Sequence, residues 1–177
     1  MMAEKITSVE EGVTLVEYGY KIKIKTTTYF DHLYKEVFFW LNHHGYQWKE
    51  LSYGVIDFPN GGNRMELLWQ GVKKEDDYST FIIDCHLAAD GADSKKKLDN
   101  GKEVKLRTGT HEFRIGAYIK KDISVWEGKL FGQQQAKLYE MLIRDRLEEQ
   151  KTQLYVEVHK FIDVLKTILK YYPEVEK

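Results

Sequence analysis

The fold of this chain is decided by residues 133–172, QQQAKLYEMLIRDRLEEQKTQLYVEVHKFIDVLKTILKYY. This stretch contains no Gly and no Pro, and it is rich in Leu, Lys, Glu, Gln and Arg, which lose little conformational freedom in a helix. Its apolar residues recur at steps of three and four, which places them on one helical face. They are Ala136, Tyr139, Ile143, Leu147, Leu154, Val158, Phe161, Leu165, Ile168 and Tyr172. The pattern predicts a long C-terminal helix.

The expected helix is long and has a polar middle. At about 1.5 Å per residue it spans roughly 60 Å, which is more than a domain of this size needs. Between Arg144 and Gln153 only Leu147 is apolar, and a second apolar segment follows. Two arrangements are open: either the helix breaks near Glu149 and folds back, or it runs straight and its distal half packs on another subunit. We favour the continuous helix, because no Gly or Pro interrupts it.

The continuous helix implies an interface between copies of the chain or with a protein partner. Residues 151–177 are its distal part and form the expected oligomerisation segment. The side chains expected in this interface are Leu154, Val158, Phe161, Ile162, Leu165 and Ile168.

The residues before the helix alternate in the manner of strands, with one helical segment among them. Strands are expected over 13–25, 47–58, 63–72, 78–89, 104–107 and 113–119, and a buried helix over 29–44, ending at Gly45. On the first strand Lys21, Lys23 and Lys25 share a solvent face, as lysines do on protected edge strands. A basic docking surface is the alternative reading of these lysines.

Turn residues separate these strands. Pro59-Asn60-Gly61-Gly62 and Asp99-Asn100-Gly101 are typical of tight turns, and Thr108-Gly109-Thr110 is expected to turn the chain once more. Residues 90–97 are polar and fit either a loop or the extension of a long hairpin. The order of elements predicts a single α+β domain over residues 1–177. It would contain a curved antiparallel sheet of about six strands, one short helix after the first strand, and one long C-terminal helix.

From Val13 to about Gln150 this order of elements resembles the helix-grip architecture of the START and polyketide-cyclase-like superfamily. The resemblance implies a sheet that wraps the C-terminal helix and leaves an apolar pocket between them for a hydrophobic small molecule. Such proteins usually carry two short helices after the first strand, where this chain has room for one. The aromatic-lined cavity would then involve Tyr20, Trp69, Phe81, Ile83, Phe113 and Tyr139.

Composition narrows the class of protein. The chain has 177 residues, 42% hydrophobic and 31% charged, with a formal net charge of −1. These values indicate a globular protein and disfavour one that coats nucleic acid. The single cysteine, Cys85, rules out a disulfide within the chain. Residues 1–12 are polar, read as a flexible N-terminus without a signal sequence, and no run reaches membrane-spanning length. A cytoplasmic location is therefore expected.

Few residues suggest chemistry. Asp84 and His86 share one face of the expected 78–89 strand and are the only candidates for a metal site, but no third ligand can be placed. Cys85 points the other way and is read as a small buried residue. No phosphate loop, dinucleotide fingerprint or paired-cysteine motif is present, so no cofactor and no catalytic residue are expected. Lys21, Lys23 and Lys25 with residues 95–97 are the best case for nucleic-acid binding, which we disfavour.

The sequence thus supports two hypotheses of different kinds. The first is a non-enzymatic interaction or oligomerisation protein that docks through its long C-terminal helix. The alternative is a domain that binds a small hydrophobic ligand in an aromatic-lined cavity between sheet and helix.

Overall fold

The computed structural model describes residues 13–59, 61–97, 103–126 and 128–170. Five strands form one antiparallel sheet in the order β1-β5-β4-β3-β2. The strands are β1 (Val13–Tyr29), β2 (Gln47–Asp57), β3 (Asn63–Lys74), β4 (Ser79–Lys97) and β5 (Glu103–Lys121). The helices are α1 (Phe30–His43), α2 (Gly132–Leu142) and α3 (Arg144–Lys170), with a short 3-10 helix, η1 (Ser124–Trp126), before α2. The α+β class, the antiparallel sheet and the long C-terminal helix are confirmed.

The sheet has five strands rather than about six because two expected strands are one. Residues 103–121 form the single strand β5, which passes through Gly109 without turning. Gly109 lies opposite Gly91 of β4, and a side chain at either position would collide with the backbone of the other strand. The two glycines therefore let β4 and β5 approach closely at this point. The expected turn at 108–110 was wrong, and polar residues 90–97 extend β4.

The two hairpins agree with the turn residues. In the β2–β3 hairpin, Gly61 and Gly62 have φ of 90° and 78°, and the Phe58 amide donates to the Gly62 carbonyl over 3.0 Å. Such positive φ values favour glycine. The Asp99-Asn100-Gly101 turn lies outside the described residues, but Lys97 of β4 pairs with Glu103 of β5 on either side of it.

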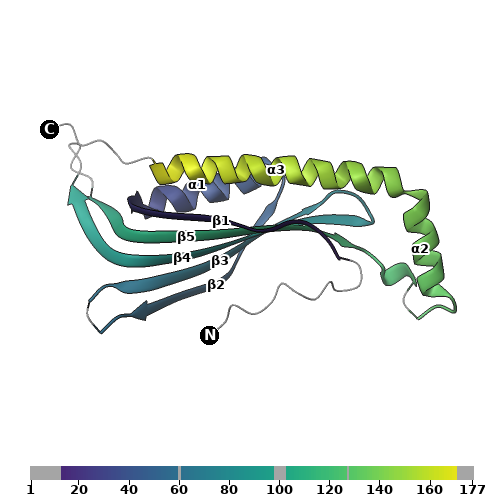
Figure 1. Ribbon diagram of the computed structural model, residues 1–177, viewed down its shortest axis with the longest axis horizontal. Helices are drawn as coiled ribbons and strands as arrows, with labels where there is room; N and C mark the ends of the chain where they lie inside the picture. Colours follow the sequence, from purple (N-terminus) through teal and green to yellow (C-terminus); the bar gives the residue numbers. More distant parts are fainter. Residues whose placement is uncertain (1–12, 60, 98–102, 127, 171–177) are drawn as a thin grey trace.

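The core lies between one face of the sheet and the helices α1 and α3, which run side by side across it (Figure 1). On α1 the buried residues are Leu33, Val37, Trp40 and Leu41, spaced for one helical face. The ring of Trp40 lies 4.9 Å from the ring of Phe161 on α3. On the sheet side, β5 contributes four core residues: Phe113, Ile115, Ala117 and Ile119. Each element contributes the face that its sequence makes apolar.

The C-terminal helix is not continuous. It breaks at Ile143, and α2 turns sharply away from α3 at the right-hand end of Figure 1. Our preference for a straight helix was therefore wrong, and so was the alternative of a break near Glu149. The helical stretch begins at Gly132, next to the expected start at 133, and the short 3-10 helix over Ser124–Trp126 precedes it. No described helix is both long and apolar enough to cross a membrane.

Candidate interaction surface

Strand β2 is an uncovered edge of the sheet. It ends the strand order, and all but one of its residues are exposed. Four of them are large and apolar: Leu51 is 50% exposed, Tyr53 60%, Val55 46% and Ile56 55%. Edge strands present unpaired backbone donors and acceptors, and long apolar edges favour pairing with another chain. This strand therefore offers both backbone and side-chain contacts to a partner.

The opposite edge, β1, is protected. Its Lys21, Lys23 and Lys25 are exposed at alternating positions, as the sequence predicts. Lys21 and Lys23 both approach Glu112 of β5, with Nζ to Oε2 distances of 3.1 and 3.8 Å. By contrast, residues 51–56 of β2, LSYGVI, carry no charge. Lysines discourage strand pairing, so the two edges are unequal and β2 is the one suited to a partner.

A register shift at Leu51 divides β2 into two parts. The irregularity lies between Glu50 and Ser52, and regular pairing with β3 resumes after it. Tyr53 then faces the same side as Leu67 of β3, and Val55 the same side as Met65. Leu67 and Met65 are buried, so Tyr53 and Val55 lie on the side of the sheet that carries the helices. They are exposed because no described helix extends over this end of the strand.

Aromatic rings extend the apolar surface from β2 onto α1. Trp48 of β2 has its ring 5.4 Å from that of Tyr34 and 5.6 Å from that of Phe38. Phe38 in turn lies 5.8 Å from Phe39, and both phenylalanines are exposed. These edge-to-face contacts hold the rings in fixed positions. The apolar surface thus runs from the tip of the β2–β3 hairpin to the end of α1.

One carboxylate is fixed within this surface. The Tyr34 hydroxyl donates to Glu50 over 3.2 Å, and the Trp69 indole N–H points at the same oxygen at 3.4 Å. Burial raises the pKa of Tyr34, and the charge and hydrogen bond of Glu50 raise it further. The phenol therefore remains a donor near neutral pH, and Glu50 is held against the sheet.

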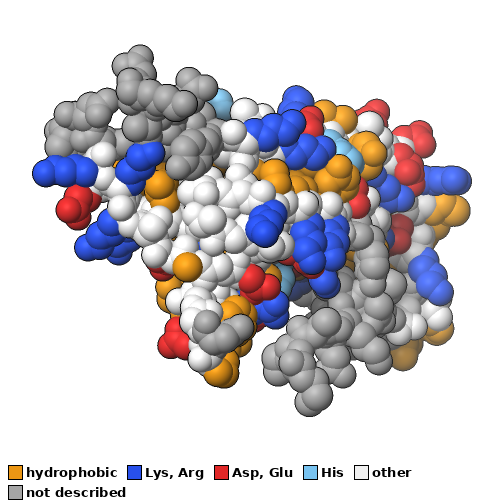
Figure 2. Space-filling view, turned by 60° about the vertical axis from the view of Figure 1, so that its left-hand side comes forward, with side chains coloured by type: hydrophobic (Ala, Val, Ile, Leu, Met, Phe, Trp, Pro, Cys, Tyr) orange, Lys and Arg blue, Asp and Glu red, His pale blue; other side chains and the backbone are white. Residues whose placement is uncertain are grey.

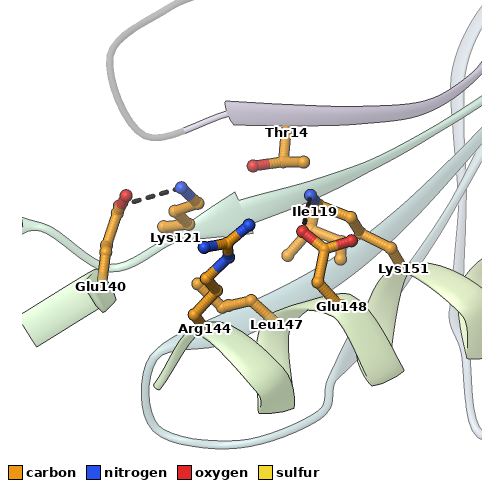
Figure 3. A pocket seen from close by; sticks show the side chains of 8 residues that line it. All are labelled: Thr14, Ile119, Lys121, Glu140, Arg144, Leu147, Glu148 and Lys151. Atoms are coloured by element: carbon orange, nitrogen blue, oxygen red, sulfur yellow. Dashed lines mark hydrogen bonds and ion pairs between the residues drawn. The ribbon is translucent and has the colours of Figure 1, made fainter. Parts of the chain in front are cut away.

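A polar pocket of about 170 Å³ lies at the other end of the molecule, between α3 and the ends of β1 and β5 (Figure 3). Two ion pairs line it: Lys121 lies 2.9 Å from Glu140, and Lys151 lies 2.6 Å from Glu148. Burial raises the pKa of Glu140, but hydrogen bonds from Lys121 and Tyr78 outweigh this effect and lower it overall. The pocket residues thus serve to tie α2 and β5 together.

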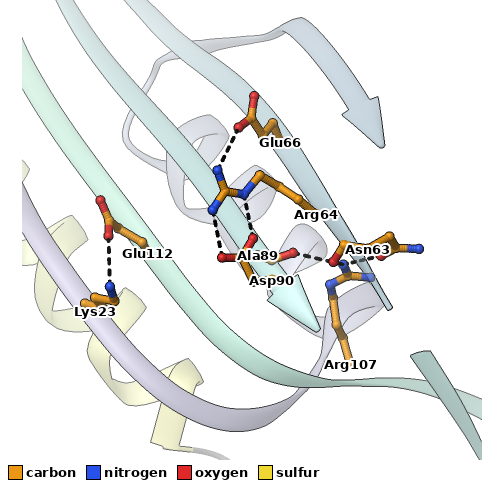
Figure 4. A network of polar contacts seen from close by, with 8 residues as sticks. All are labelled: Lys23, Asn63, Arg64, Glu66, Ala89, Asp90, Arg107 and Glu112. Carbon is orange, nitrogen blue, oxygen red and sulfur yellow. Dashed lines mark hydrogen bonds and ion pairs between the residues drawn. The ribbon is translucent and has the colours of Figure 1, made fainter. Parts of the chain in front are cut away.

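Two polar networks link neighbouring strands of the sheet, that of Arg64 on the outer face and that of Arg107 on the face that carries the core (Figure 4). Arg64 of β3 donates two hydrogen bonds, of 2.6 and 2.8 Å, to the carboxylate of Asp90 on β4. The buried Arg107 of β5 donates to the side chain and carbonyl of Asn63 and to the carbonyl of Ala89. With the 2.7 Å bond from Nη1 to Asp93, these contacts cross three strands and pair both terminal nitrogens of the guanidinium, whereas Nε has no partner among the described residues. On the face shown in Figure 2, basic side chains lie among acidic, apolar and uncharged ones.

The residues expected at a subunit interface lie in the core of the chain itself. Their exposed fractions are 7% for Ile168 and 0% for Leu154, Val158, Phe161, Ile162 and Leu165. The interface assignment was wrong because the break at Ile143 lets α3 fold back over the sheet. Its apolar face is consequently covered by β1, β5 and α1. Residues 171–177 and 1–12 lie outside the described residues.

The six expected cavity residues do not enclose a cavity. Trp69, Phe81, Ile83 and Phe113 are fully buried in the core, where side chains of α1 and α3 pack against them. Tyr20 packs at the edge of the core. Tyr139 lies on α2, with its ring 5.2 Å from that of Tyr78. The sequence identified large apolar side chains correctly, but helix packing fills the space that a cavity would need.

The metal candidates Asp84 and His86 lie on the outer face of β4. Asp84 accepts a hydrogen bond from Gln70 over 2.9 Å, and burial raises its pKa. Within the described ranges, no three His, Cys, Asp or Glu side chains are grouped as metal ligands would be. Cys85 is buried, and burial raises the pKa of its thiol, so it is a poor nucleophile.

The sequence reading missed the β2 edge. Its signal is the charge-free run at residues 51–56, which distinguishes β2 from the lysine-rich β1. Comparisons of the chain with protein-family models, with characterised proteins and with solved structures gave no significant match. The resemblance to the helix-grip superfamily therefore stays a prediction, and the functional argument has to come from the surface itself.

Proposed function

We propose that this protein is a non-enzymatic interaction protein that forms a homodimer through antiparallel pairing of two β2 edges. The observation that carries the proposal is the uncovered, charge-free stretch 51–56 with its four exposed apolar side chains. A twofold axis across this stretch would join two five-stranded sheets into one of ten. The proposal places the interface on β2 rather than on α3, because the apolar face of α3 is buried within the chain.

The expected affinity follows from what pairing would bury. Each of the four apolar side chains is about half exposed, so covering it contributes about 1 kcal/mol, or about 8 kcal/mol over both copies. Roughly six new backbone hydrogen bonds contribute about 6 kcal/mol more. Association costs about 4–15 kcal/mol. With an association cost of about 8 kcal/mol, within this range, the surplus is about 6 kcal/mol, which corresponds to a Kd of tens of micromolar.

The test is molar mass in solution, measured by sedimentation equilibrium from about 5 to 500 µM, a range that brackets the expected Kd. Tyr53→Lys places a charge in the middle of the pairing edge and should leave only monomer. Leu15→Lys is the matched control, because Leu15 is an exposed apolar residue on β1, 44% exposed. This control should dimerise as the unchanged protein does. A protein that stays monomeric throughout, or two variants that behave alike, would refute the proposal.

The ligand-binding alternative has less support, because four of the six expected cavity residues are packed in the core. A cytoplasmic location stays a prediction.

A further inference from the structure

The segment 128–142, which comprises residues 128–131 and α2, forms an arm at the end of the molecule remote from the β2–β3 hairpin (Figure 1). The arm carries the four most exposed large apolar side chains of the described chain, Leu130, Phe131, Met141 and Leu142, together with the exposed Leu138. Their exposed fractions are 83% for Leu130, 65% for Phe131, 55% for Leu138, 65% for Met141 and 75% for Leu142. Three of these side chains form an apolar stripe along one side of the helix, because Phe131, Leu138 and Leu142 are seven and four residues apart.

The inner side of the arm is anchored, which fixes the apolar stripe outward. The ring of Tyr139 lies 5.2 Å from Tyr78 and 5.3 Å from Trp126. Glu140 accepts hydrogen bonds of 2.9 Å from both Lys121 and the Tyr78 hydroxyl. These contacts use the polar and aromatic residues of α2 and leave its aliphatic residues without cover.

Phe131 is held in an unusual backbone conformation. It has φ of 64° and ψ of 19°, and among the described residues it is the only one other than glycine with a positive φ. A bulky residue rarely adopts this conformation, which costs about 1–3 kcal/mol. The Phe131 ring is exposed, so packing in the core does not offset the cost of this backbone conformation. The strain therefore presents an aromatic side chain to the outside.

Basic groups flank the stripe. A hollow of about 710 Å³ between the arm, η1 and the end of β5 is lined by Lys121, Lys129 and Lys137 together with Trp126 and Phe131. Lys121 is neutralised by Glu140. Lys129 and Lys137 form no ion pair with any residue that the structure describes. Two lysines with no ion pair among the described residues thus lie beside an exposed apolar stripe.

We propose that the arm docks on an anionic membrane surface, with Leu130, Phe131, Leu138, Met141 and Leu142 entering the boundary between headgroups and acyl chains. Amphipathic helices with an apolar face and flanking lysines bind such surfaces in this way. Lys129 and Lys137 lie beside the lipid phosphate and carboxylate groups, which supply the missing counter-charge. The β2 edge is at the other end of the molecule, so this docking and dimerisation are compatible.

The experiment is vesicle flotation with the full chain, comparing pure phosphatidylcholine vesicles with vesicles containing about one third phosphatidylserine. The unchanged protein should float with the anionic vesicles and much less with the neutral ones. High salt should weaken the binding because it screens the lysines. Replacing both Lys129 and Lys137 by Gln should weaken it about 30-fold, since each lysine near the surface contributes about 5-fold.

Two further variants complete the design. Phe131→Asn with Leu138→Gln should abolish flotation while preserving the fold, because Asn accepts a positive φ and Gln is a good helix former. Lys49→Gln with Lys105→Gln, two exposed lysines outside the arm, should leave flotation unchanged. The proposal is overturned if the unchanged protein does not float, or if the arm and control lysine variants lose binding equally. It is also overturned if the apolar variant lowers the molar mass of the protein without vesicles, since the arm would then contact a second copy.

Discussion

Truncation of Phe161 to alanine should destabilise the isolated chain strongly. Phe161 is 0% exposed and packs against Trp40 of α1, with 4.9 Å between the rings. A buried aromatic side chain removes about 150–250 Å² from water. At about 25 cal/mol per Å² this area is worth roughly 4–6 kcal/mol. Phe→Ala substitutions in cores cost about 3–5 kcal/mol, so we expect a loss of about 4 kcal/mol.

The assay is equilibrium unfolding in urea, followed by circular dichroism. With a slope of about 2 kcal/mol per M, the midpoint should fall by about 2 M. Tyr155→Ala is the control, because Tyr155 lies on the same helix but is 49% exposed. It should cost less than about 1 kcal/mol. Both variants should be measured at about 1 µM, below the Kd expected for pairing of the β2 edges, so that the midpoints report the single chain.

Equal effects of Phe161→Ala and Tyr155→Ala would refute the reasoning, since they would mean that α3 does not bury its apolar face within the chain. A loss of stability by Phe161→Ala that appears only at high protein concentration and vanishes at about 1 µM would point to the same failure. The helix would then have to pack on another subunit, as the polar middle of the sequence first indicated.

Three other predictions concern polar and backbone features. Burial raises the pKa of Glu157, but hydrogen bonds from Tyr46, Lys73 and Gln153 lower it overall. The ionised Glu157 therefore stabilises the fold above the pKa it has in the unfolded chain, and this stabilisation is lost as the pH falls through its pKa in the folded protein. Glu157→Gln should therefore cost about 2 kcal/mol at pH 7 and little in acid, as urea unfolding at both pH values would reveal. Burial raises the pKa of Asp84, so the ionised carboxylate destabilises the fold at pH 7. Asp84→Asn should therefore raise the melting temperature at pH 7 but not at low pH. A lower melting temperature at pH 7 would contradict this prediction. Gly109→Val should lower the melting temperature or prevent folding, because its side chain would meet the backbone of β4, whereas Gly54→Val, where the space is open, should be tolerated.

Local sequence patterns predict the elements whose signals come from neighbouring residues. The apolar spacing of α1, the Gly45 stop and the glycines of the β2–β3 turn all describe short-range geometry. The lysines of β1 likewise indicated an edge before the strand order was known. The apolar face of α3 was also read correctly from its spacing, although not what it packs against.

The exposed β2 edge and the bend between α2 and α3 depend on contacts between residues far apart in the sequence. α2 leaves the line of α3 at Ile143, where no Gly or Pro marks a break, because Glu140 is bound by Tyr78, 62 positions earlier. β2 is an edge only because β1 pairs with β5 and leaves it last in the sheet. The sequence by itself determined which faces are apolar, because periodicity is local. Tertiary structure alone decided which of those faces are covered, because that depends on strand order and helix direction.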